Sequence, residues 1–138
     1  MRILAIDYGD TRTGVAVSDA TGTLAGETWV ITSTSQKSVA DMIAAEVSAR
    51  GVARIVVGYP KNMNGTIGPR AERSGQFAEL LREKCGVEVV LWDERMTTIS
   101  AGRILSDAGR YGKKRKNTID AVAASLILEG YLLHLKDR

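Results

Sequence analysis

Hydrophobic residues in the first quarter of the chain recur in short runs that are typical of β-strands. Residues 3–7 form an apolar run that predicts a buried strand, and residues 14–18 predict its hairpin partner across the turn at 9–13. A third strand is expected around residues 27–32. Together the three runs predict an antiparallel meander.

The rest of the chain alternates between helical spacing and short apolar runs. This pattern predicts helices at 38–50, 69–85, 97–108 and 118–136, and strands at 54–58 and 87–92. Gly51, Gly86 and Gly109 follow three of these helices as stop signals. The element order predicts an α/β fold of the sandwich type, a five-stranded mixed sheet in which the antiparallel meander joins parallel strands, with helices on both faces.

Length and composition support one ordinary globular domain over residues 1–138. The chain is 44% hydrophobic and 25% charged, which is the range of folded proteins. A single cysteine, Cys85, excludes an internal disulfide framework. We find neither a secretory hydrophobic segment nor a run of the roughly 18 apolar residues that a membrane span needs, so we expect cytoplasmic localisation.

Positive charge is concentrated in one short segment. The net charge of +3 says little by itself, but Arg110, Lys113, Lys114, Arg115 and Lys116 lie together without an acid between them. Phosphate contacts from such a segment would supply salt-dependent affinity for nucleic acid with little sequence information. The alternative interpretation is a solvated loop ahead of the last helix.

Three carboxylates lie at the ends of predicted elements. Asp7 ends the first strand, Glu94 follows the fifth, and Asp120 lies in the first turn of the last helix. Each has a structural alternative, because Asp7 can initiate the hairpin, Asp120 can interact with the helix dipole, and Glu94 can do the same or pair with Arg95. Strand parity places Asp93 and Glu94 on opposite faces of the sheet, so we expect at most one of them beside Asp7.

Taken together, Asp7, Glu94 and Asp120 predict a divalent-metal site. Two acids at strand ends and one at the start of a helix packed on the sheet would converge on one point. Oxygen-rich clusters of this kind bind Mg²⁺ or Mn²⁺, and two such ions promote phosphodiester hydrolysis. The single histidine, His134, gives little support to zinc or imidazole chemistry. We therefore predict that the three acids are the metal ligands and catalytic residues of a hydrolase.

Four segments, in order along the whole chain, resemble the YqgF (RuvX) family. They are residues 7–19 (DYGDTRTGVAVSD), 57–66 (VGYPKNMNGT), 93–98 (DERMTT) and 115–124 (RKNTIDAVAA). The resemblance implies a ribonuclease H-like fold related to Holliday-junction resolvases, and a nuclease that matures the 5′ end of pre-16S rRNA in ribosome biogenesis. It also implies Asp7, Glu94 and Asp120 as the catalytic acids. The strand at 54–58 ends without the acid of classical resolvases, so the second carboxylate is expected from Glu94, with Asp93 as the alternative.

Other polar residues near the predicted site are candidates for binding nucleic acid. Arg12, in the first turn, can neutralise a phosphate oxygen, or it can pair with Asp10 or Asp19. Arg95 can act in the same way or form a local ion pair. Asn62 belongs to a glycine-containing polar loop that can reach sugar and phosphate groups, although many loops of this composition are plain connections.

Other functions fit parts of the pattern. Asp7 and Gly9 in a hairpin also suit an actin-like ATPase, but the chain is short for the two domains of that class. A non-catalytic nucleic-acid-binding protein would keep the same fold and charge. Among nucleases, a Holliday-junction or branched-DNA resolvase should be a symmetric dimer, because it needs two active sites. An enzyme acting on structured RNA can be a monomer or a homodimer.

Overall fold

The computed structural model describes residues 1–96 and 112–136. Its elements are β1 (Arg2–Asp7), β2 (Arg12–Ser18), β3 (Ala25–Thr32), α1 (Gln36–Arg50), β4 (Val52–Tyr59), α2 (Pro69–Cys85), β5 (Glu88–Asp93), a short 3₁₀ helix η1 (Glu94–Met96) and α4 (Gly112–Lys136). The helix expected at 97–108 and the basic residue Arg110 lie outside the described residues.

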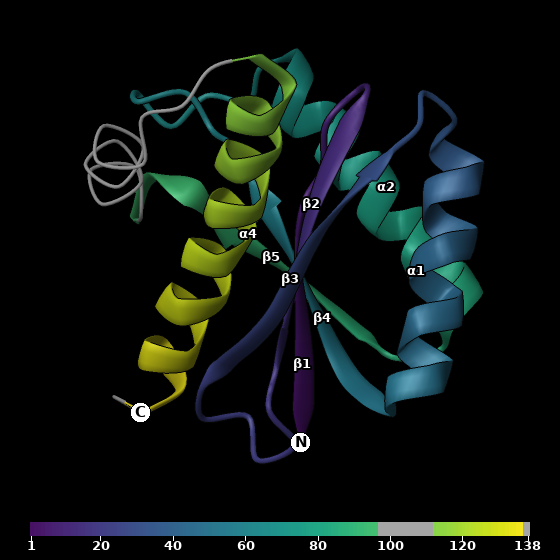
Figure 1. Ribbon diagram of the computed structural model, residues 1–138. Helices are drawn as coiled ribbons and strands as arrows, with labels where there is room; N and C mark the ends of the chain where they lie inside the picture. Colours follow the sequence, from purple (N-terminus) through teal and green to yellow (C-terminus); the bar gives the residue numbers. More distant parts are fainter. Residues whose placement is uncertain (97–111, 137–138) are drawn as a thin grey trace.

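The five strands form one mixed sheet in the order β3-β2-β1-β4-β5 (Figure 1). β2 is antiparallel to both β1 and β3, whereas β4 is parallel to both β1 and β5. The expected antiparallel meander joined to parallel strands is therefore confirmed. Because β1, β4 and β5 run in the same direction, their carboxyl ends share one edge of the sheet, at the upper end of Figure 1. The first turns of α2 and α4 lie at that same end.

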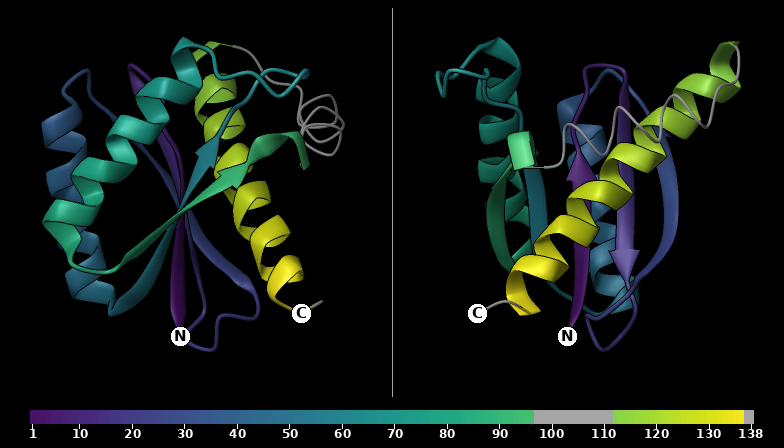
Figure 2. Two further views of the ribbon diagram at one scale, coloured as in Figure 1. Left: turned by 180° about the vertical axis from the view of Figure 1, so that it is seen from behind. Right: turned by 90° about the vertical axis from the view of Figure 1, so that its left-hand side faces the viewer.

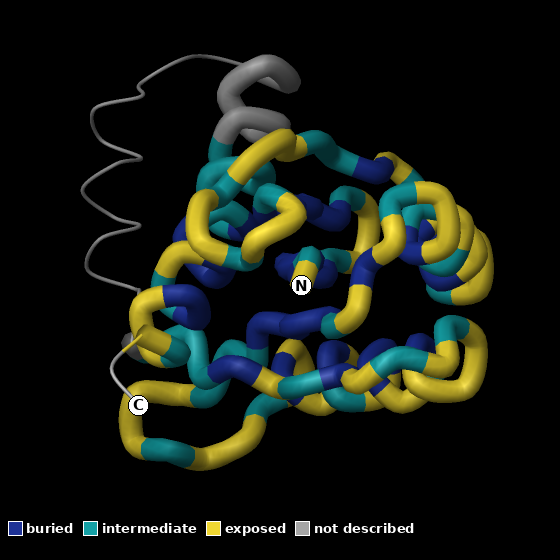
Figure 3. Tube along the Cα trace, turned by 90° about the horizontal axis from the view of Figure 1, so that it is seen from below, coloured by how far each residue is buried: buried dark blue, intermediate teal, exposed yellow. Residues whose placement is uncertain are grey.

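Helices cover both faces of the sheet; of the described helices, α1 and α2 lie on one face and α4 on the other (Figure 2). Alternate residues of β1 point to opposite layers, as strand geometry requires. Leu4 and Ile6 join the layer under α1 and α2, whereas Ile3 and Ala5 join the layer under α4. Figure 3 shows the buried positions gathered along the strands, with exposed positions on the outer sides of the helices and in the connections.

Local signals at the helix ends account for the bounds of α1 and α2. The hydroxyl of Ser35 accepts a hydrogen bond from the backbone N–H of Ser38 at the start of α1. Gly51 and Gly86 adopt left-handed conformations, with φ of 67° and 66°, just after the two helices. Glycine adopts this conformation without the steric cost that a side chain would bring, so the stop signals at Gly51 and Gly86 are confirmed, while Gly109 lies outside the described residues.

The last helix is longer than the sequence pattern predicts. α4 begins at Gly112 and not near Thr118, so the stretch from Lys113 to Lys116 is helical backbone and not a loop. Lysine and arginine favour helices, and neither proline nor glycine interrupts this stretch, so the helix extends beyond its amphipathic part. In the described ranges, no helix has the length and apolarity that would allow it to cross a membrane.

Candidate active site

Asp7 lies at the centre of the polar edge formed by the carboxyl ends of the parallel strands. It follows Ile3 and Ala5 on the α4 face of β1, and only 7% of its surface is exposed. Burial raises its pKa to about 6; the nearby positive charge of Arg70 opposes this shift, and the negative charge of Asp120 adds to it. Nη2 of Arg70 lies 3.3 Å from Oδ1 of Asp7. Asp7 is thus a buried acid that is hard to ionise.

A glycine on β2 brings Asp120 toward Asp7. Gly14 pairs directly with Asp7 in the antiparallel ladder. A Cβ atom at Gly14 would lie 2.1 Å from the backbone oxygen of Asp120 and 3.4 Å from Cβ of Ala124. The first contact is shorter than real Cβ atoms show, so only glycine lets α4 rest on the strand at this depth. The start of α4 therefore packs closely on the sheet beside Asp7, as the sequence analysis expected of a helix packed on the sheet.

A second glycine makes room for Glu94. Ile6 pairs with Val57, so Gly58 comes next to Asp7 on the other neighbouring strand. A Cβ atom at Gly58 would lie 2.8 Å from Oε2 of Glu94. Burial and the negative charge of Asp7 together raise the pKa of Glu94 to about 7, against the opposing positive charge of Arg70. The carboxylate of Glu94 therefore extends back over the end of β4 and interacts electrostatically with Asp7.

The adjacent acid, Asp93, has a different environment. Nη2 of Arg95 lies 2.6 Å from Oδ2 of Asp93, and the backbone N–H of Arg95 also donates to this carboxylate. These hydrogen bonds lower the pKa of Asp93. Asp93 is therefore ionised and engaged with Arg95, as the local ion-pair alternative for Arg95 predicts. Of the two neighbouring acids, Glu94 is the one whose pKa responds to Asp7.

Arg12 pairs with an acid that the sequence analysis did not propose for it. Its Nε lies 3.0 Å from Oδ2 of Asp120, with 35% and 21% of the two side chains exposed. The alternative interpretation, an ion pair of Arg12 with Asp10 or Asp19, does not match the structure. Asp10 pairs with Arg73 at 3.0 Å, and Asp19 accepts hydrogen bonds within its own loop. The cause is the position of α4, which places Asp120 beside the start of β2.

The electrostatics of this edge suit a divalent cation, although the acidic side chains do not lie close enough together to coordinate one. The negative charge of Asp120 disfavours ionisation of Asp7, and that of Asp7 disfavours ionisation of Glu94. A cation bound by carboxylate oxygens would relieve this repulsion. Within residues 1–96 and 112–136, no three Asp, Glu, His or Cys side chains form a group that could hold a metal ion. Ion binding therefore requires these side chains to draw together.

Of the remaining predicted binding residues, the structure describes the side chain of Asn62 but not those of the basic residues in α4. Asn62 lies in the connection between β4 and α2, where its side-chain amide donates to the hydroxyl of Thr66. Its backbone also bonds to that of Thr66, which closes the loop on itself. Lys113, Lys114, Arg115 and Lys116 lie in the first turns of α4, ahead of Asp120, but their side chains lie outside what the structure describes.

Two arginines near the acids were missed by the sequence analysis. Arg70 and Arg73 lie in the first two turns of α2, and they pair with Asp7 and Asp10 respectively. The available signal was Pro69, because proline favours the first position of a helix. A helix that starts there, after a parallel strand, places its first turns at the carboxyl edge of the sheet.

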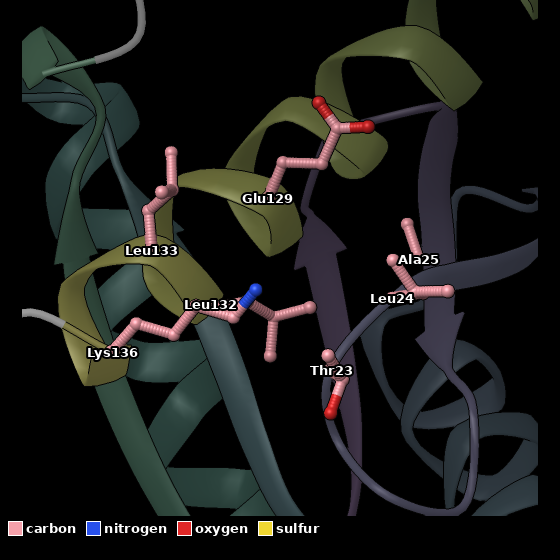
Figure 4. Close-up of a pocket in the computed structure, with 7 residues that line it drawn as sticks. All are labelled: Thr23, Leu24, Ala25, Glu129, Leu132, Leu133 and Lys136. Carbon is pink, nitrogen blue, oxygen red and sulfur yellow. The ribbon is translucent and has the colours of Figure 1, made fainter.

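An apolar hollow elsewhere on the molecule is separate from these acids. It has a volume of about 240 Å³ and lies between the β2–β3 loop and the C-terminal half of α4 (Figure 4). Leu24, Leu132 and Leu133 are among its lining residues, with Glu129 and Lys136 as the charged ones. None of the three candidate acids lines it, so the polar edge remains the candidate active site.

Comparison with known proteins gives a family for the chain. A family profile described as "RuvX: Holliday junction resolvase" matches residues 1–134. A relative from Halothermothrix orenii, named "Putative pre-16S rRNA nuclease", is 45% identical over 133 residues, which cover 96% of this chain and 94% of the relative. A relative of the same name from Bacillus cereus (strain AH187) is 49% identical over 134 residues, covering 96% and 98%.

Solved structures support the same fold. RuvC of T. thermophilus in complex with a Holliday-junction substrate aligns with a TM-score of 0.62 at 12% identity and 96% coverage of both chains. The fowlpox virus Holliday junction resolvase aligns with a TM-score of 0.56 at 16% identity, covering 98% of this chain and 99% of the viral one. These matches confirm the expected ribonuclease H-like fold. The full-length sequence matches establish that the chain belongs to the RuvX family of nucleases.

Proposed function

We propose that the chain is a divalent-metal-dependent nuclease of the cytoplasm that hydrolyses phosphodiester bonds in structured RNA, with the 5′ region of pre-16S rRNA as its preferred substrate. The observation that carries the proposal is the buried Asp7 between two further acids, each of which interacts electrostatically with it. Buried acids with raised pKa values cluster at functional sites, because a fold gains no stability from acids that repel one another.

Asp7, Glu94 and Asp120 are the proposed ligands of Mg²⁺ or Mn²⁺. Their carboxylate oxygens are the donors that such hard cations prefer. When bound, a pair of these ions supplies the activated water and the charge stabilisation that phosphodiester hydrolysis needs. Gly14 and Gly58, on either side of Asp7, leave the space through which Asp120 and Glu94 approach it.

Positive residues around the acids provide the proposed contacts to the nucleic-acid backbone. Arg12 is partly exposed beside Asp120 and is placed to bind a phosphate oxygen near it. The basic residues from Lys113 to Lys116 lead directly into the helical turn that holds Asp120. Arginine and lysine in such positions bind phosphates with little regard to base sequence, which suits recognition of shape.

We propose RNA and not branched DNA as the substrate because the chain is more similar in sequence to relatives named for RNA than to the resolvases. The relatives named for pre-16S rRNA share 45–49% of their residues with this chain over nearly full length. The resolvase structures share 12–16%, a similarity that speaks for fold alone. A branched-DNA resolvase remains the alternative, and it would require a symmetric dimer with two active sites.

A non-catalytic nucleic-acid-binding protein is the second candidate function. The observation that favours it is that two of the three acids already have arginine partners, with Asp7 beside Arg70 and Asp120 beside Arg12. In such a protein the arginines would permanently take the place that cations occupy in a nuclease.

A cleavage panel with a matched pair of variants tests the proposal. Wild-type protein, Glu94→Gln and Asp93→Asn are incubated with a pre-16S rRNA fragment, an unstructured RNA and a synthetic four-way DNA junction, each with Mn²⁺, Mg²⁺ or EDTA. We expect metal-dependent cleavage of the precursor fragment by wild type and Asp93→Asn, and at least a hundredfold loss in Glu94→Gln.

Three other results would contradict parts of the proposal. Preferred cleavage of the junction would replace RNA with branched DNA as the substrate. An equal loss of cleavage in Glu94→Gln and Asp93→Asn would contradict the assignment of Glu94, and not Asp93, to the site. Binding of RNA without cleavage under any metal would establish the non-catalytic function.

A further inference from the structure

A pair of arginines on α2 faces the same turn that presents Asp7, and the proposed metal site does not use them. Arg70 contacts Asp7 at 3.3 Å, and Arg73, three residues later, contacts Asp10 at 3.0 Å. Residues three apart on a helix lie on one face, so both guanidinium groups point toward the β1–β2 turn. The arginines therefore form a positive border to the candidate active site on the α2 side.

These ion pairs are weak as structural contacts. The side chain of Arg70 is 57% exposed, and that of Arg73 is also largely exposed. Ion pairs in contact with water contribute little to stability, and a single contact at 3.3 Å is far from the paired geometry of a tight arginine–carboxylate interaction. Both guanidinium groups are therefore free to exchange their carboxylate partners for a stronger anion.

The backbone under the two arginines, in contrast, is firmly held. The rings of Tyr8 and Phe77 stack with their centroids 4.2 Å apart, which joins the β1–β2 turn to the middle of α2. Ala71 and Ser74, each directly after one of the two arginines in the sequence, are buried against the core. The position of α2 relative to Asp7 is thus determined by the core, while the arginine side chains remain exposed.

A small hollow lies where the arginines meet the turn. Its volume is about 60 Å³, and Tyr8, Gly9, Asp10, Arg70 and Arg73 line it. At about 30 Å³ for each water in the liquid, it has room for roughly two water molecules. That space suits a compact anion such as one phosphate group, and it is too small for a nucleoside. The lining places two guanidinium groups around it and the acid of the candidate site just beside it.

We propose that Arg70 and Arg73 bind a backbone phosphate of the substrate next to the scissile one, and thereby position the scissile phosphate at Asp7. Arg70 is the principal residue, and it moves from Asp7 to the phosphate when nucleic acid binds. The planar guanidinium group matches two phosphate oxygens at once, which gives direction as well as charge. This inference rests on the proposed nuclease function, and it assigns the two arginines a positioning role in that reaction.

The test compares Arg70→Gln with Arg82→Gln, a control from the far end of the same helix. Arg82 is also exposed, and it pairs with Glu79 and with the carbonyl of Val89, away from the acids. Binding of each protein to a labelled pre-16S rRNA hairpin is measured in EDTA across a salt series, and single-turnover cleavage is measured with Mn²⁺. The thermal unfolding midpoint of each variant verifies folding.

For Arg70→Gln, we expect about tenfold weaker binding and a salt dependence lower by about one phosphate contact. Single-turnover cleavage at saturating enzyme should fall about tenfold to a hundredfold, because a displaced scissile phosphate reacts slowly. Arg70→Lys should retain the salt dependence but recover only part of the cleavage rate. Lysine keeps the positive charge but lacks the planar guanidinium group that binds two phosphate oxygens at once. Arg73→Gln should show smaller losses in the same direction.

Failure of this inference is distinguishable from failure of the proposed function. Wild-type protein that binds and cuts, with Arg70→Gln equal to Arg82→Gln in salt dependence and rate, overturns the positioning role and leaves the nuclease intact. Full recovery of the rate in Arg70→Lys overturns the requirement for the guanidinium fork. Wild-type protein that neither binds nor cuts overturns both.

Discussion

Two aspartates precede hairpin connections, Asp7 as the last residue of β1 and Asp19 just after β2, and their environments are opposite. Asp19 is partly exposed and accepts hydrogen bonds from the hydroxyl of Thr21 and the backbone N–H groups of Thr23 and Leu24. These bonds lower its pKa to about 2. Asp7 is buried, its donor comes from a distant helix, and its pKa rises to about 6.

The difference between the two aspartates separates an acid stabilised by its own loop from the acid that we propose as functional. The charge of Asp19 is satisfied by the loop that contains it, so its role ends with the turn. Burial and the neighbouring charge of Asp120 oppose the charge of Asp7, so its surroundings cost stability unless a cation binds there. Sequence position alone cannot distinguish the two, because both follow an apolar strand and precede a glycine-containing turn.

The largest expected effect concerns cleavage. Asp7→Asn should lower the single-turnover rate on the pre-16S rRNA fragment by about a thousandfold or more, because it removes the central ligand of the proposed metal site. Asp19→Asn, at the other hairpin, should stay within about twofold of wild type. Rates are compared with Mn²⁺ at pH 8. Similar losses in both variants would break the contrast between the two aspartates.

The next effect concerns the packing that buries Asp7. Gly14→Ala places a Cβ atom against the backbone of Asp120, so it should lower the free energy of unfolding by about 2–3 kcal/mol. Gly75→Ala is the matched control, because its Cβ atom would lie 3.5 Å from Cε1 of Tyr59, an ordinary contact. Alanine is favoured over glycine within a helix, so this variant should gain up to about 1 kcal/mol. Urea unfolding measures the free energy of unfolding of both variants. A Gly14→Ala protein as stable as Gly75→Ala would show that the packing of α4 does not need the glycine.

The smallest effect concerns stability and pH without metal. Because the pKa of Asp7 rises from 3.8 to about 6 on folding, the native state binds this proton more tightly, and stability falls as pH increases from about 4 to about 6. Above that range, Asp7→Asn should unfold about 5 °C higher than wild type, the shift that roughly 1–2 kcal/mol produces in a domain of this size.

The expected effect on stability has the opposite sign for Asp19. Its folded pKa is lowered, so its stabilising contribution is present above pH 4 and is lost as pH falls through about 2. Asp19→Asn should therefore unfold at a lower temperature than wild type at pH 8. Thermal unfolding in EDTA at pH 4 and pH 8 measures both variants. A destabilised Asp7→Asn at pH 8 would mean that Arg70 compensates the charge of Asp7 after all.

The sequence predicts the strands, the ends of two helices and the three acids, because these depend on local patterns. Apolar runs and glycine stops act over a few residues, and Gly51 and Gly86 end their helices as expected. The pairing of Asp7 with Arg70 joins residues 63 apart, and that of Arg12 with Asp120 joins residues 108 apart. Such contacts depend on how α2 and α4 rest on the sheet, which strand and helix periodicity does not specify.

The role of Gly58 could not be predicted from the sequence either. Gly58 stands out only as the absence of an acid at the end of β4, yet its missing side chain is what admits Glu94. The choice between Glu94 and Asp93 likewise needed the structure, because parity indicates that the two acids diverge and not which of them meets Asp7. The hydrogen bonds of Asp93 with Arg95 decide it.

The central claim is that Asp7 is a cation ligand, and a Mn²⁺ titration at pH 8, where the acids are ionised, tests it most directly. Electron paramagnetic resonance counts free Mn²⁺ over wild-type protein, Asp7→Asn and Asp19→Asn. The account predicts the same affinity for wild type and Asp19→Asn, and affinity weakened about tenfold or more in Asp7→Asn. Mn²⁺ bound equally well by Asp7→Asn would contradict it.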